Sequence, residues 1–122
     1  MINAKLIYNT VLNDERIKAV AKTVLDAYPE TITKFPCVVY LDASQSDKEF
    51  ADNLPTVDSL GVEVHIFTKT VGNYKTTTEI GIVIANVMKE NEFICTSNRE
   101  VPDTEDNIKH RVMYFIRDVY SL

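Results

Sequence analysis

The side chains in this sequence that could carry out acid–base or nucleophilic chemistry are His65, His110, Asp42 and Ser44. A serine becomes a nucleophile when a histidine takes its proton and an aspartate orients that histidine. Asp42, Ser44 and His65 lie in one stretch, residues 35–68, whose two arms would bring them together in a hairpin. The sequence contains no nucleophile elbow and no glycine placed for an oxyanion hole. We therefore interpret Asp42 and Ser44 as polar residues at a strand end, and His65 as a surface residue or a member of a cross-strand pair.

Metal and cofactor chemistry is also poorly supported by the sequence. Zinc needs several Cys or His residues at short spacings, whereas Cys37, Cys95 and the two histidines are each isolated. The three glycines, at positions 61, 72 and 81, are too scattered to form a phosphate-binding loop. We expect no metal and no cofactor. Both cysteines lie among apolar residues and are predicted to be buried free thiols in a reducing compartment, with one disulfide as the alternative.

An acidic group, Asp103, Glu105 and Asp106, precedes the last predicted strand. It lacks the glycine and the distal glutamate of a calcium loop. The simplest interpretation is a solvated turn. The alternative is that several copies form a negative collar, which would repel DNA phosphates and let DNA pass without binding.

Length and composition indicate one domain, residues 1–122, with a single core. The chain is 45% hydrophobic and 25% charged, as in ordinary globular proteins, and its net charge of −5 argues against a nucleic-acid-binding surface. The N-terminus lacks the pattern of a signal peptide, and no apolar run approaches the length of a membrane span.

The strongest structural signal is residues 35–68, which predict a long β-hairpin with a polar connection. In its second arm, apolar and polar residues alternate with the period of a half-buried strand. Helical patterns cover residues 2–12 and 14–28, the latter ending before Pro29. A third helix begins at Thr76, which has the capping-box spacing with Glu79. Residues 93–101 and 108–120 predict a second hairpin. The expected fold is α+β, with about four mostly antiparallel strands from two hairpins and three helices packed on one face.

The last predicted strand has apolar residues on both faces, with Val112, Tyr114 and Ile116 on one and Met113, Phe115 and Val119 on the other. If the helices cover one face only, the second apolar row must be covered by something else. Another copy of the chain would cover it, so we expect a homo-oligomer.

Four segments in order, FPCVVYLD, VDSLGVEVHIFTK, TTTEIGIVIANVMKENEF and VPDTEDNIKHRVMYFIRDV, resemble the small tail-completion proteins of long-tailed bacteriophages and prophages. The resemblance covers about residues 14–120 and rests on order and spacing. It implies a non-enzymatic tail terminator or head-to-tail joining subunit, which forms a ring, usually hexameric, at the end of the tail tube. Its partners would be the tail tube protein and the head-completion connector, with DNA passing through the ring. Assembly would occur in the host cytoplasm, and the final location would be the head-proximal end of the virion tail.

Two other functions stay open from the sequence. One is a cytoplasmic binding module, an adaptor or inhibitor that uses the hairpin tip, residues 44–55, where Asp47, Lys48 and Phe50 are interface candidates. The other is a small enzyme built around Asp42, His65 and His110. For a ring, the interface candidates are the same tip residues together with Tyr114 and Ile116, and the acidic group 103–106 would face the lumen.

Overall fold

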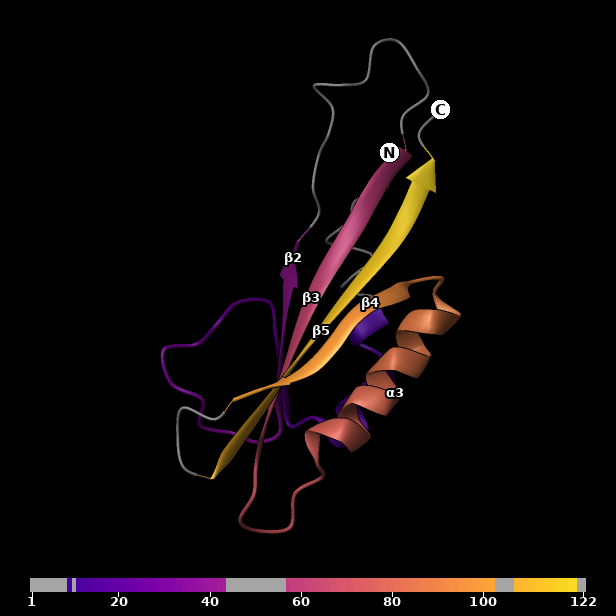
Figure 1. The fold of residues 1–122 in the computed structure, drawn as a ribbon. Coiled ribbons are helices and arrows are strands. Elements are labelled where there is room, and N and C mark those ends of the chain that lie inside the picture. Colours follow the sequence, from indigo (N-terminus) through magenta and orange to yellow (C-terminus); the bar gives the residue numbers. More distant parts are fainter. Residues whose placement is uncertain (1–8, 10, 44–56, 103–106, 121–122) are drawn as a thin grey trace.

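The computed structural model describes residues 9, 11–43, 57–102 and 107–120, with 57–59 and 118–120 described through their backbone alone. The elements in these ranges are α2 (Glu15–Val20), β1 (Thr23–Leu25), β2 (Cys37–Asp42), β3 (Val57–Lys69), α3 (Thr77–Glu90), β4 (Ile94–Val101) and β5 (Ile108–Tyr120). Figure 1 shows a strongly twisted sheet with α3 lying along one side of it. The predicted α+β class is therefore confirmed.

The sheet contains five strands in the order β1-β2-β3-β5-β4. Three neighbouring pairs are antiparallel, namely β2 with β3, β3 with β5, and β4 with β5. Both predicted hairpins are thus present. The prediction of about four strands missed β1, which pairs in parallel with β2 and makes the sheet mixed.

The N-terminal region differs most from the prediction. A helix over residues 14–28 was expected, but α2 ends at Val20 and the chain is already extended at Ala21. Thr23–Leu25 then pairs with Cys37–Val39. Apolar residues of this region suit both helical and strand periods, and the open edge of β2 favours the strand. The expected helix over residues 2–12 lies mostly outside the described residues, of which 9, 11 and 12 are helical.

The short helix α2 is anchored at its N-terminal end. Its N-cap is Asp14, whose carboxylate accepts a hydrogen bond from the backbone N–H of Arg16 at 2.8 Å. The Arg16 guanidinium also contacts Asp14 at 3.0 Å and Glu90, the last residue of α3, at 2.7 Å. This arginine holds the pKa of Asp14 down at about 2. The ion pairs therefore tie the start of α2 to the end of α3.

The helix α3 begins where the sequence predicts. Thr76 is the N-cap, and its side chain and that of Glu79 form a complete capping box. At the other end Glu92 adopts a left-handed φ of 69°, and the N–H of Phe93 bonds back to the carbonyl of Met88 at 3.0 Å. The chain can therefore leave the helix and enter β4 within a few residues.

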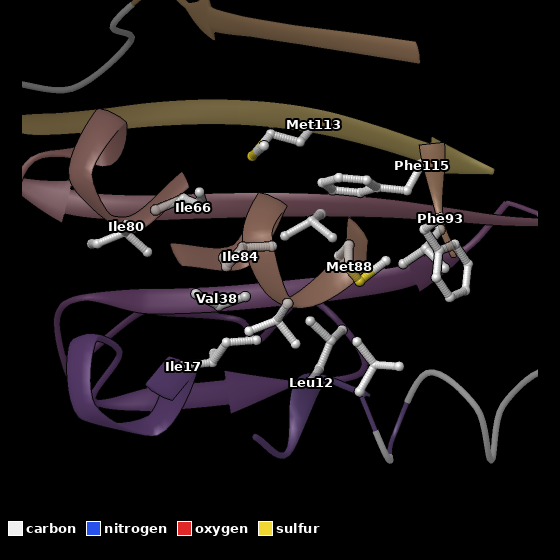
Figure 2. Close-up of a cluster of buried hydrophobic side chains, with 14 of the residues drawn as sticks. Leu12, Ile17, Val38, Ile66, Ile80, Ile84, Met88, Phe93, Met113 and Phe115 are labelled. Atoms are coloured by element: carbon white, nitrogen blue, oxygen red, sulfur yellow. The ribbon is translucent and has the colours of Figure 1, made fainter. Parts of the chain in front are cut away.

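The core lies between the two helices and the sheet face that they cover, which we call the inner face. Alternate residues of the strands point into it, and successive turns of α3 supply Ile80, Ile84 and Met88 (Figure 2). From β5 it receives Met113 and Phe115, which are 0% and 1% exposed. Burial of these apolar side chains is the main stabilising contribution to the fold.

Gly81 allows α3 to approach the sheet closely. A Cβ at this position would lie 3.3 Å from the sulfur of Met113 and 3.7 Å from Cδ1 of Ile66.

We expect Gly81→Leu to lower the free energy of unfolding by about 1–3 kcal/mol, because the leucine side chain overfills the contact between α3 and the sheet. Urea denaturation followed by circular dichroism measures the change. Gly81→Ala is the control and should be nearly neutral, since the gain in helix propensity, about 1 kcal/mol, offsets a small shift of Met113. A Leu variant as stable as the wild type would contradict the close approach.

The two longest strands extend beyond the rest of the sheet. β3 and β5 pair over their whole length, from Val57 with Tyr120 to Lys69 with Ile108. The pairing of β2 with β3 stops at Val62, and that of β4 with β5 stops at Ile116. In Figure 1 the ends of β3 and β5 accordingly rise past β2 and β4 as a two-stranded ribbon.

Candidate functional site

The sheet face turned away from α2 and α3, here called the outer face, carries an apolar row on β5. Val112, Tyr114 and Ile116 point to this face and are half-buried, whereas their neighbours Met113 and Phe115 are fully buried on the inner face. The predicted two-sided pattern of this strand is confirmed for these residues. Tyr114 and Ile116, which the sequence suggests as interface residues, both lie in the row.

The connection between β1 and β2, residues 26–36, crosses the other part of the outer face. The ring of Tyr28 meets His65 edge-on, with 5.0 Å between the centroids, and lies 6.4 Å from Phe67. Further along, Nζ of Lys69 lies 4.9 Å from the centre of the Phe35 ring. Between the connection and Cys37 is a cavity of about 270 Å³. The connection therefore leaves the row on β5 as the less covered part of this face.

A line of hydrogen bonds joins three titratable side chains on the outer face. Nε2 of His65 lies 2.6 Å from Oε1 of Glu63, and Nδ1 of His65 lies 2.7 Å from Nε2 of His110. An ionised carboxylate can only accept, so His65 carries a hydrogen on Nε2 and its Nδ1 accepts from His110. The side chain of His65 is 7% exposed and that of Glu63 is 32% exposed.

Strand register explains why these residues meet. Phe67 is directly opposite His110, and His65 is opposite Val112, so the two histidines are diagonal neighbours across β3 and β5. The rings of Phe67 and His110 stack with their centroids 4.2 Å apart. The pair is thus enclosed by aromatic rings from β3 and from the connection.

The surroundings keep His110 neutral. Burial is the largest cause that lowers the pKa of His110 to about 4, and electrostatic repulsion from His65 and Arg99 adds to it. Burial and the Glu63 carboxylate raise the pKa of Tyr28, so its hydroxyl remains protonated. At neutral pH the cluster therefore holds an uncharged His110 ring between Phe67 and β4.

The cluster can pass protons along its line, but its geometry does not favour nucleophilic catalysis. Both ring nitrogens of His65 are already bonded, so His65 cannot accept a serine proton without losing a partner. Asp42 pairs with Val62, an inner-face position, and so lies on the opposite side of the sheet from His65. Ser44 lies outside the described residues. The alternative that groups Asp42 with His65 is therefore contradicted by the register of the described strands, whereas His65 does form a cross-strand pair, with His110.

Six of the predicted site residues cannot be placed, and two partners of His65 were not predicted. Asp47, Lys48 and Phe50, like Asp103, Glu105 and Asp106, lie outside the described residues. Glu63 and Tyr28 were missed as partners of His65. The spacing of Glu63 and His65, two apart on a strand, puts both on one face and was a usable signal, whereas Tyr28 was assigned to a helix.

The cysteines are both free, and one is buried as predicted. Cys37 is 1% exposed, and burial raises the pKa of its thiol. Cys95 is exposed, which corrects the prediction. It lies on the edge strand β4, where an irregularity between Cys95 and Ser97 shifts the register and the side chains remain in solvent. In the described ranges no group of three or more His, Cys, Asp or Glu side chains is arranged to hold a metal ion.

Comparison with models of known protein families gives no match, and no curated protein matches the sequence. None of the helices in the described ranges is long and apolar enough to cross a membrane.

Proposed function

We propose that this chain is a structural subunit that assembles into a ring at the end of a phage or prophage tail tube, as a tail terminator or head-to-tail joining protein. The observation that carries the proposal is the half-buried apolar row Val112, Tyr114 and Ile116 on the outer face. Each further Å² of apolar surface that a neighbouring subunit covers contributes roughly 25 cal/mol. The order of the four quoted sequence segments supports the same class of protein.

The ribbon of β3 and β5 supports assembly through a second contact. Within the described residues, the backbone of Val57–Leu60 pairs only with that of residues 117–120, and neither strand has a third partner there. A strand edge that has no third partner among the described residues is a candidate to accept a strand or loop from another chain. β4 is less suited to this, because its bulge and its charged Arg99 and Glu100 discourage pairing at an edge.

The proposed ring leaves the acidic group Asp103, Glu105 and Asp106 facing the lumen. Its negative charge would keep DNA phosphates from adhering during passage. The chain's other partners in this proposal are the tail tube protein and the head connector, and no enzymatic step is required. The location is the head-proximal end of the tail.

The proposal is tested by measuring molar mass with light scattering across a wide range of protein concentration, followed by negative-stain microscopy. We expect a defined oligomer that grows with concentration and appears as rings with a central hole. Because a subunit can require its partner for assembly, the measurement is repeated with tail tube protein. A strict monomer under both conditions would contradict the proposal and favour a binding module acting through residues 44–55.

A further inference from the structure

We infer that the His65–His110 pair is an acid-sensitive switch, which holds the connection of residues 26–36 on the outer face until both rings carry a proton on each nitrogen. This inference concerns the single subunit and does not require assembly. It follows from the number of protons that the ring nitrogens of His65 and His110 can carry while the hydrogen bonds of the line Glu63–His65–His110 are kept. The connection is the element that moves, because Tyr28 packs directly on His65.

One added proton fits into the pair. Between an imidazolium and an imidazole the 2.7 Å hydrogen bond is kept, because one nitrogen still donates and the other still accepts. The Glu63 carboxylate, 2.6 Å from His65, balances the charge. A singly protonated pair therefore keeps its geometry.

A second proton does not fit. With both rings fully protonated, the N–H of His65 Nδ1 and the N–H of His110 Nε2 point at each other across 2.7 Å. The hydrogen bond is lost, and two positive charges face each other in a site that is largely shielded from solvent. Either ring can relieve this only by turning away, and His65 cannot turn without displacing Tyr28.

The groups around the pair make the second proton unfavourable in the closed arrangement. Glu63 on β3 is the one facing carboxylate, whereas Arg99 on β4 lowers the pKa of His110 and Lys69 on β3 adds positive charge at the same end of the face. Cys37 of β2 and Tyr28 of the connection have raised pKa values and stay neutral. These statements concern the described residues.

The sign of the pH dependence follows from the pKa of His110. It is lowered from 6.5 to about 4 in the closed arrangement, so the closed arrangement is fully favoured above pH 6.5. As pH falls from 6.5 towards 4, proton uptake by the open form increases its population, by roughly tenfold to a hundredfold. Below about pH 4 both forms are protonated and the change levels off.

Hydrogen exchange measured by mass spectrometry at pH 7 and at pH 4.5, corrected for intrinsic rates, tests this. Amides of residues 26–36 in the wild type should exchange about tenfold faster or more at pH 4.5, while those of α3 keep their protection. His110→Gln is the matched variant, because its amide still donates to His65 but does not titrate. Its residues 26–36 should change by less than about twofold.

Arg99→Gln provides a second, independent variant. Removing this positive charge should raise the pKa of His110 in the closed arrangement, so acid should open residues 26–36 less than in the wild type and the change should level off at a higher pH. Proton NMR of the imidazole signals follows the same titration without any substitution. Equal pH dependence in the wild type and His110→Gln would overturn the inference. So would simultaneous loss of protection in α3, or two imidazoles that titrate independently near pH 6.5.

Discussion

Phe115→Ala should lower the free energy of unfolding by about 3–5 kcal/mol, the largest stability effect that we expect from a single substitution. Phe115 is 1% exposed on the inner face, and Figure 2 shows it in one buried cluster with Phe93 and with Met88 of α3. Removal of the ring loses its transfer free energy and leaves a cavity that β5, paired on both sides, cannot close. Urea denaturation followed by circular dichroism gives the value, with the slope of the transition as a check on two-state behaviour.

Tyr114→Ala is the matched control for Phe115→Ala, one position along the same strand. Tyr114 is half-buried on the outer face, and its hydroxyl donates one hydrogen bond to the carbonyl of Ala43 at 3.3 Å. Its loss should cost about 1–2 kcal/mol, since the side chain is only partly buried and makes one hydrogen bond. If the two variants lost equal stability, the assignment of one face to the core and the other to an interface would be wrong.

Ile116→Asp should abolish assembly while leaving the subunit folded, the largest functional effect expected under the proposed ring. A carboxylate in a covered apolar row would be desolvated without a partner, which costs several kcal/mol for each interface. The concentration needed for assembly should rise by roughly a hundredfold or more. Light scattering across protein concentration measures it, and circular dichroism verifies that the fold is retained.

Ile82→Asp is the control for chemistry and charge. Ile82 is 57% exposed on α3, away from the outer face, and it receives the same substitution. Its variant should assemble as the wild type does. An Ile116→Asp variant that still forms rings would exclude the outer face as the interface, whereas equal loss in both variants would point to a general effect of charge or solubility.

The switch and the interface share one face of the sheet. His110 and Val112 are alternate residues on the outer side of β5, and Val112 lies opposite His65. Release of residues 26–36 would uncover Cys37 on β2 and His65 on β3, of which His65 lies next to the apolar row. The surface open to a partner would therefore increase as pH falls.

The sequence by itself determined the elements whose signals are local. The capping box of Thr76 and Glu79, the alternation along the second arm of the first hairpin and the two faces of β5 all follow from residue type and spacing. Each depends on contacts within a turn of helix or on alternation along one strand. The α+β class and both hairpins were predictable for this reason.

Only the tertiary structure decided the rest, because those features depend on which distant segments become neighbours. Thr23–Leu25 forms a strand because the edge of β2 offers it backbone hydrogen-bond partners. The residue types of this segment do not predict that pairing. Cys95 is exposed because it lies on an edge strand, which an apolar sequence context does not reveal. The line of Glu63, His65 and His110 exists because β3 pairs with β5 in one particular register. A shift of that register by one residue would turn the side chains of β5 to the other face and separate the two histidines.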